Sequence, residues 1–286
     1  SISYEKYWRG YSSTSMSNSF SMAKSWVATL IGAAIKDGYI KSVDQRVGDF
    51  LPDFKYGQKS KITIKHLLTM SSGLNWNENY YNPLGQTAEA YYGDNLKKLI
   101  LSLRSVDFPG KTFIYHSSCT QILSFVIESA TNKTISKYMS EKLWVPMGAS
   151  KKASWSTDNH GNEKAFCCIN SNARDFARIG KLYLNYGVYN NVRIIDSSFV
   201  KQAITPSNLV AKNGLPNERY GYHFWITRHK GLDVFYSRGH LGQYVICVPK
   251  KNMIIVRLGE KSSEELPNGH HKDLYEYLDG ALEMFF

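Results

Sequence analysis

The chain has 286 residues, of which 43% are hydrophobic and 14% aromatic, and it carries a formal net charge of +11. At roughly 150 residues per domain, this length predicts one large domain or two smaller ones. The 20 Tyr, 13 Phe and 6 Trp exclude a disordered chain. The longest apolar run, Trp26 to Ile35, is too short for a membrane span, which needs about 20 residues. Because no basic run is longer than a pair, we expect no nucleic-acid partner despite the positive charge.

The first residues, Ile2 to Trp8, have the composition of a strand. The chain opens at Ser1 with neither Met nor a signal peptide, so we expect an upstream segment to be missing from it. The adjacent Cys167 and Cys168 do not fit a simple disulfide framework. No C-x-x-C pair exists, which argues against a zinc ribbon or a thioredoxin-like redox pair.

Helical patterns fill the first two thirds of the chain. The strongest follows Ser19 and Phe20, because apolar residues recur at steps of three and four from Met22 to Ile35, and Gly38 then ends the helix. This pattern predicts a helix that is buried on most of its circumference. Further helices are predicted at Thr63–Thr69, Thr87–Leu103, Thr120–Thr131, Ile135–Leu143 and Ala173–Tyr186.

The last third is rich in β-branched and aromatic residues, which favours strands. We predict strands at Tyr220–Thr227, Val234–Arg238, Gln243–Val248 and Met253–Leu258, with a hairpin turn at 249–252 and a closing helix at Asp273–Phe286. The predicted class is α+β: both termini join one antiparallel sheet, the first and last helices flank it, and a mostly helical subdomain is inserted. The expected division is residues 1–40 with 165–286 as the sheet domain and 41–164 as the insert, with the site in the cleft between them.

Ser21-Met22-Ala23-Lys24 is the central chemical motif. Residues three apart share a helix face, so the Ser21 hydroxyl and the Lys24 amine can lie within hydrogen-bond reach. A serine becomes a nucleophile when a base takes its proton, and a lysine can do so when burial or nearby positive charge disfavours its ammonium form. Alone the motif is weak, because an N-cap serine and a surface lysine would give the same spacing.

Two later segments strengthen this interpretation. Tyr115 lies where a short extended piece meets a helix that begins near Ser118, so its side chain can project into a cleft. Gly239-His240-Leu241-Gly242-Gln243 precedes a β-branched strand, and its glycines allow a ligand to approach the backbone closely.

In order and approximate separation, Ser21-Met22-Ala23-Lys24, Tyr115-His116-Ser117 and His240-Leu241-Gly242 resemble the three motifs of the serine β-lactamase and penicillin-binding-protein superfamily. The closest branch is the class C-like group with the family VIII esterases and the 6-aminohexanoate-dimer hydrolases. The segments Leu67–Leu74, Phe108–Tyr115 and Cys168–Asp175 also look like that group, so the resemblance covers nearly the whole chain. It implies the β-lactamase/transpeptidase-like fold.

The resemblance also implies a mechanism. Ser21 would attack an ester or amide carbonyl, while Lys24 and Tyr115 would share the proton, and which of the two is the formal base stays open. The backbone N–H groups of Ser21 and Gln243 would form the oxyanion hole. The resemblance implies no metal and no organic cofactor.

Substrate contacts are expected from Tyr80, Trp76, Ser117, His240 and Gly242. Tyr80 falls where the 6-aminohexanoate-dimer hydrolases carry a substrate-contacting tyrosine. Trp76 and Tyr81, in the same loop after Gly73, could equally pack the loop. His240 could be a structural hydrogen-bonder, and Ser117 could position Lys24 or cap the following helix.

The chain departs from true lactamases at Ser117, where they usually have Asn. It also departs from them at His240-Leu241-Gly242, where they have Lys-Thr-Gly. Small esters or amides are therefore the expected substrates. A β-lactamase or D-amino-acid peptidase, and a penicillin-binding receptor without turnover, are the alternatives. The oligomeric state and compartment stay open. The family resemblance favours an exported bacterial location over a cytoplasmic one.

Overall fold

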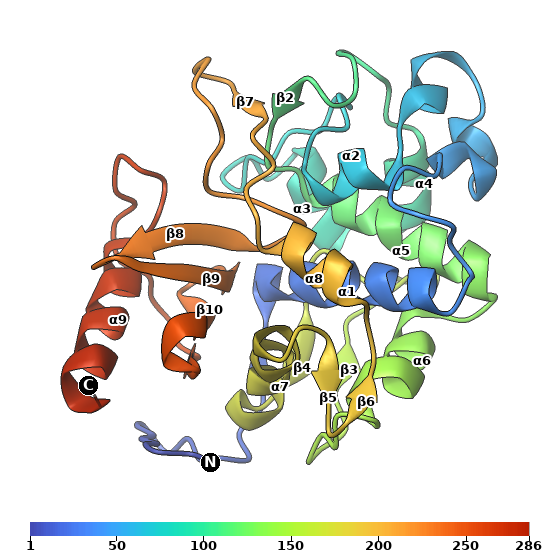
Figure 1. Ribbon diagram of the computed structural model, residues 1–286. Helices are drawn as coiled ribbons and strands as arrows, with labels where there is room; N and C mark the ends of the chain where they lie inside the picture. The colour runs from blue at the N-terminus through green and yellow to red at the C-terminus, as the bar shows by residue number, and fades with distance from the viewer. Residues whose placement is uncertain (286) are drawn as a thin grey trace.

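The structure is a computed structural model that describes residues 1–285 (Figure 1). Its α-helices are α1 Ala23–Lys36, α2 Ile64–Leu68, α3 Gln86–Tyr92, α4 Leu96–Leu101, α5 Ser117–Thr131, α6 Ile135–Met139, α7 Ala173–Leu184, α8 Ser197–Ala203 and α9 Lys272–Phe285. Its strands are β1 Ser17–Asn18, β2 Thr112–Phe113, β3 Ser154–Trp155, β4 Ile169–Ser171, β5 Val188–Tyr189, β6 Val192–Arg193, β7 Val210–Ala211, β8 Trp225–His229, β9 Leu232–Gly239, β10 Gln243–Val248 and β11 Met253–Arg257. The predicted α+β class is confirmed.

The largest sheet is an antiparallel meander of four strands in the order β11-β10-β9-β8. The sequence predicted all four strands, and β10 has the predicted bounds. Strand β8 begins later than expected because the chain turns before it: His223 has a φ of 58°, and Tyr220 pairs back onto Trp225. Every residue of β10 is buried, as expected for a strand covered on both faces.

Helices cover both faces of this sheet. Successive side chains of a strand point to opposite faces. On β10, Cys247 lies against Gly180 of α7, whereas the hydroxyl of the oppositely directed Tyr244 donates to Asp273 of α9. Helix α1 lies on the α7 side, since Thr29 and Tyr183 hydroxyls are 3.1 Å apart. The first and last helices therefore flank the sheet as predicted (Figure 1). The last residue of the expected closing helix, Phe286, lies outside the described residues.

The N-terminal prediction was wrong. Residues Ile2 to Trp8 form no strand, and the N-terminal segment contributes only β1, to a separate three-stranded sheet of order β1-β4-β3. The termini therefore do not share one sheet. Ion pairs, in place of strand pairing, hold the first residues. Arg174 pairs with Glu5 at 2.6 Å, and Arg9 pairs with Glu260 at 2.9 Å.

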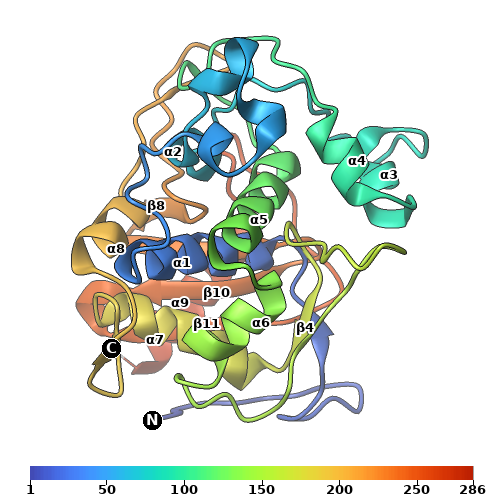
Figure 2. The ribbon, with the colours of Figure 1, turned by 90° about the vertical axis from the view of Figure 1, so that its right-hand side faces the viewer.

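The middle of the chain is helical, as expected, but some helix boundaries differ from the predicted ones. The predicted helix over 87–103 is two helices, α3 and α4, because Gly93 ends α3 in an extended conformation with a ψ of 166°. Figure 2 shows these two helices at the periphery, while α5 crosses the centre beside α1. Twelve of the fourteen residues of α1 are buried, in agreement with the apolar pattern on most of its circumference.

Within residues 1–285, no helix has the length and apolar character that crossing a membrane requires. The division into residues 1–40 with 165–286 and 41–164 stays a prediction.

Candidate functional site

Ser21 lies on a 3-10 turn, η1 (Phe20–Met22), between strand β1 and helix α1. Strand β4 fixes this turn, because Ser19 N donates to Ile169 O (2.7 Å) and Ile169 N donates to Ser19 Oγ (3.0 Å). Phe20, directly before Ser21, has a φ of 44°, in the left-handed region that costs a non-glycine residue about 1–2 kcal/mol. The surrounding hydrogen bonds hold the half-buried Ser21 in this sharp turn.

Lys24 lies in the first turn of α1 and is 1% exposed. Its Nζ is 2.9 Å from Ser21 Oγ and donates to Phe166 O at 2.8 Å. The spacing of three residues thus brings the amine to the hydroxyl as predicted. The Lys24 nitrogen and the Ser21 hydroxyl are therefore within direct hydrogen-bond distance, with the nitrogen buried.

Tyr115 lies in the extended segment before α5, with its ring half-buried. Its ring stacks on Trp225 (5.6 Å between centroids) and meets Tyr220 edge-on (6.0 Å). Lys24 Nζ is 5.1 Å from the centroid of the Tyr115 ring. The first two motifs therefore meet in space, although 90 residues separate them in the sequence.

The third motif, at the end of β9 and start of β10, lies against the Ser21 turn. A Cβ placed on Gly239 would be 2.2 Å from Ser19 O, so only glycine allows this approach. Gly242 has a φ of 78°, and Arg257 Nη1 donates to its carbonyl at 2.6 Å. The Gln243 side chain binds backbone at Gly259, accepting from its N–H at 2.9 Å. These contacts fix the backbone around Gln243 beside the Ser21 turn.

The rings of Tyr80 and His240 stack on each other, with centroids 6.0 Å apart and planes 6° from parallel. His240 also meets Phe20 edge-on at 5.7 Å, and Tyr80 lies 6.5 Å from Tyr91. Tyr80 is 46% exposed, so the pair offers an aromatic surface next to the Ser21 turn. Two of the predicted substrate contacts thus lie together, and one of them, His240, contacts Phe20 in the Ser21 turn.

Two more of the predicted contacts, Ser117 and Trp76, meet at Glu78, a residue that the sequence did not single out. Ser117 donates both its N–H (2.7 Å) and its Oγ–H (2.5 Å) to the Glu78 carboxylate, and it makes no hydrogen bond to Lys24 among the described residues. Trp76 Nε1 donates to the same carboxylate at 2.5 Å. Because Trp76 is only 5% exposed, its position favours loop packing over substrate contact. Tyr81 is 96% exposed, so its side chain does not pack the loop.

Phe166, which holds Lys24, precedes a disulfide between the adjacent Cys167 and Cys168. Cys168 has a φ of 71°, and the next residue, Ile169, pairs with Ser19. The disulfide therefore lies between the two segments that hold Lys24 and the Ser21 turn. The sequence suggested no such bond. The other two cysteines, Cys119 and Cys247, are free and buried.

A buried histidine joins the helices beneath the site. Ser25 Oγ donates to His223 O at 2.7 Å, and His223 Nε2 is 3.0 Å from Thr120 Oγ1, which links α1 to α5. Burial, assisted by the positive charge of Lys24, lowers the pKa of His223 to about 3. This histidine is therefore neutral at pH 7.

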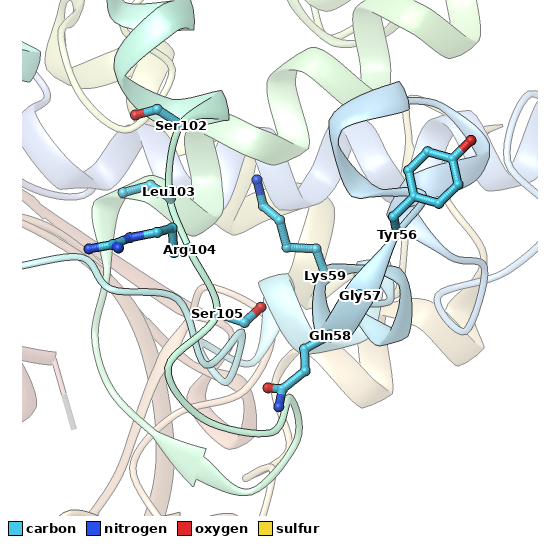
Figure 3. Close-up of a pocket in the computed structure, with 8 residues that line it drawn as sticks. All are labelled: Tyr56, Gly57, Gln58, Lys59, Ser102, Leu103, Arg104 and Ser105. Atoms are coloured by element: carbon cyan, nitrogen blue, oxygen red, sulfur yellow. The ribbon is translucent and has the colours of Figure 1, made fainter.

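A separate hollow of about 470 Å³ lies between residues 56–59 and 102–105, and none of the predicted site residues lines it (Figure 3). Lys59 extends into it and donates to Leu101 O at 2.9 Å, while the Arg104 side chain points away from Lys59.

Comparison with known proteins places these residues in a known family. The sequence matches the Beta-lactamase family over residues 2–276. It is 24% identical over 283 residues to the 6-aminohexanoate-dimer hydrolase of Paenarthrobacter ureafaciens, covering 93% of this chain and 71% of that one. The chain spans 66% and 49% of the length of two other curated relatives that it matches.

Solved structures agree with this assignment. The putative 6-aminohexanoate-dimer hydrolase from Bacillus anthracis superposes with a TM-score of 0.81 at 23% identity, over 98% of this chain and 75% of that chain. A family VIII carboxylesterase superposes with a TM-score of 0.74 at 17% identity, over 94% and 83%. These likenesses confirm the expected β-lactamase/transpeptidase-like fold. The chain therefore belongs to the beta-lactamase family and is a hydrolase of that family.

Proposed function

We propose that the protein hydrolyses small esters or amides through an acyl-enzyme on Ser21. The position of Lys24 carries this proposal: a buried amine lies 2.9 Å from the Ser21 hydroxyl, and its second hydrogen bond, to Phe166 O, fixes its orientation. Such a pair turns a weak nucleophile into a strong one when the substrate carbonyl arrives.

The reaction begins when Ser21 Oγ attacks the carbonyl carbon and its proton passes to the Lys24–Tyr115 pair. The oxyanion that forms accepts hydrogen bonds from the N–H groups of Ser21 and Gln243. Losing one such donor typically costs about 3 kcal/mol of transition-state stabilisation. The proton then goes to the leaving alcohol or amine, the C–O or C–N bond breaks, and an acyl-Ser21 ester remains.

Water completes the cycle by attacking the acyl-Ser21 carbonyl. It gives its proton to the same pair, and the acid product leaves as Ser21 recovers its proton. Apart from the attacking water, every role in these reaction steps belongs to a side chain or backbone group of the chain.

Two features support esters and linear amides as the substrates. The relatives include a carboxylesterase and a 6-aminohexanoate-dimer hydrolase by name. At the third motif, this chain has the aromatic surface of His240 and Tyr80 instead of the lysine of lactamases.

Covalent labelling tests the proposal. Wild type and Ser21→Ala are treated with a fluorophosphonate, and intact mass followed by peptide mapping locates the adduct. We expect one adduct per chain, on Ser21, and none on the variant. An unlabelled wild type, or a label on another residue, would remove Ser21 as the nucleophile. Parallel exposure to nitrocefin and penicillin separates the alternatives: turnover would indicate a lactamase, and a stable adduct without turnover a receptor.

A further inference from the structure

The Glu78 carboxylate is an unusual hub beside the site. It accepts hydrogen bonds from Trp76 Nε1 (2.5 Å), the Tyr80 hydroxyl (2.6 Å), Ser117 Oγ (2.5 Å) and Ser117 N (2.7 Å). A carboxylate offers about four lone-pair positions, so these donors use its full capacity. Glu78 takes part in none of the ion pairs found among residues 1–285. Neutral donors alone therefore compensate its charge.

One arm of this hub holds the catalytic tyrosine's segment. Ser117 is the first residue of α5, a helix of 15 residues, so its free N–H lies at the positive end of the helix dipole. Binding to Glu78 fixes this N–H and the Ser117 hydroxyl together. Tyr115 is only two residues earlier, so the same contact restrains the backbone that carries its ring.

The other arm holds the aromatic surface. The Tyr80 hydroxyl donates to Glu78 while its ring stacks on His240, which in turn contacts Phe20, next to Ser21. Burial of this hydroxyl, together with the negative charge of Glu78, raises the pKa of Tyr80. Tyr80 therefore stays a hydrogen-bond donor throughout the pH range in which proteins are stable.

From this arrangement we infer that Glu78 is a positioning residue with two separable effects. Through Tyr80 it holds the Tyr80–His240 surface, on which the apolar chain of the ester or amide packs. Through Ser117 it sets the position of Tyr115 for proton transfer. The inference rests on the proposed function, and it adds a substrate class: acyl or leaving groups with an apolar chain.

The test compares kcat and KM for p-nitrophenyl esters from acetate to octanoate in Glu78→Gln, Tyr80→Phe and Ser117→Ala. An amide has one acceptor oxygen and a donor NH₂, so Glu78→Gln leaves some of the four donors without a partner. Glu89→Gln is the matched control, because Glu89 is exposed on the neighbouring helix α3 and only its backbone carbonyl accepts hydrogen bonds.

We expect a split between the two arms. Tyr80→Phe raises KM for octanoate about tenfold, with little change for acetate and little change in kcat. Ser117→Ala lowers kcat about tenfold for every ester, with KM unchanged. Glu78→Gln shows both effects, and Glu89→Gln shows neither.

Other results would overturn the inference. If both single variants lowered kcat and raised KM to the same extent, Glu78 would have only a general structural role. If the Glu78→Gln enzyme behaved like the Glu89→Gln control, Glu78 would have no role. If Glu78→Gln fails to fold, the two single variants still decide. Fluorophosphonate labelling of Ser21 in wild type keeps this test apart from the proposed function: a labelled wild type without the split contradicts only the role of Glu78.

Discussion

The start of α1 and the segment 75–92 both border the site, yet they are built differently. Lys24 belongs to the buried helix α1, and Ser21 to the half-buried turn before it, which strand β4 fixes. The segment 75–92 is largely exposed around residues 79–84 and contains one short helix, and its Glu78 carboxylate accepts two hydrogen bonds from Ser117 at the start of α5. The comparison teaches that Lys24 and Ser21, the proposed reacting groups, are held by the core, whereas Tyr80, a proposed substrate contact, is held by one hydrogen bond to Glu78 and by stacking on His240.

The largest effect is expected from Lys24. Lys24→Met keeps most of the buried volume but removes the nitrogen 2.9 Å from Ser21 Oγ. We expect kcat/KM for p-nitrophenyl acetate to fall by at least about 10³-fold, since general-base catalysis contributes roughly 10²–10⁴-fold. The melting temperature serves as the control for folding. A rate within tenfold of wild type would show that the core amine is not the base.

Tyr115→Phe tests whether the lysine works alone. The ring contacts with Trp225 and Tyr220 need no hydroxyl, so the fold should be retained. We expect kcat to fall by about 10²-fold or more with KM little changed, because only proton transfer is lost. Steady-state kinetics on one ester measure this. Near-normal turnover would leave Lys24 as the sole base.

Gly239→Ala tests the contact between β9 and the Ser21 turn. The added Cβ would lie 2.2 Å from Ser19 O, so the strand or the turn must move. Overpacking of this kind costs about 1–3 kcal/mol, and we expect kcat to fall by more than tenfold as the Gln243 N–H shifts. Denaturant unfolding and kinetics report the two effects. Gly231→Ala is the comparison, because nothing lies within 4 Å of its Cβ position, although its φ of 75° adds local strain. Equal kinetics in the two variants would argue against the oxyanion role of Gln243.

Acid should lower the stability of the folded protein. Burial lowers the pKa of His223 to about 3, and of His116 and His270 to about 4 each, against 6.5 for the free side chain. With folded pKa values depressed, the unfolded chain binds more protons, so stability is full above about pH 6.5 and falls as pH drops towards 4. Between pH 7 and pH 5, each histidine should lower the free energy of unfolding by about 2 kcal/mol. Denaturant unfolding at both pH values measures this, and equal stability would contradict it.

The smallest effect is expected at Tyr81. Its side chain is 96% exposed, so Tyr81→Ala should change the free energy of unfolding by less than about 0.5 kcal/mol and leave kinetics unchanged. Tyr80→Ala, one residue earlier, is the contrast, because its ring stacks on His240. A marked loss of activity in Tyr81→Ala would mean that the segment moves over the site during catalysis.

The sequence predicted most of what depends on local spacing. Helix α1, strand β10 and the approach of Lys24 to Ser21 follow from short-range periodicity, and the order of the three motifs predicted the family. Glu78 was missed because its partner Ser117 is 39 residues away and neither residue belongs to a periodic pattern. Phe166 was missed because it acts through its carbonyl, which any residue supplies. The Ile2–Trp8 strand was wrong because composition cannot show whether a strand has a neighbour to pair with.

The central claim is that substrate is carried on Ser21, and pre-steady-state kinetics test it most directly. Mixing enzyme with excess p-nitrophenyl acetate in a stopped-flow instrument follows release of nitrophenolate. If acylation is faster than deacylation, wild type should show a burst equal to about one nitrophenolate per chain, and acid quenching during the steady state should leave an acetyl group on Ser21. Turnover by wild type with no acetyl-Ser21 trapped, or an equal rate in Ser21→Ala, would contradict the account.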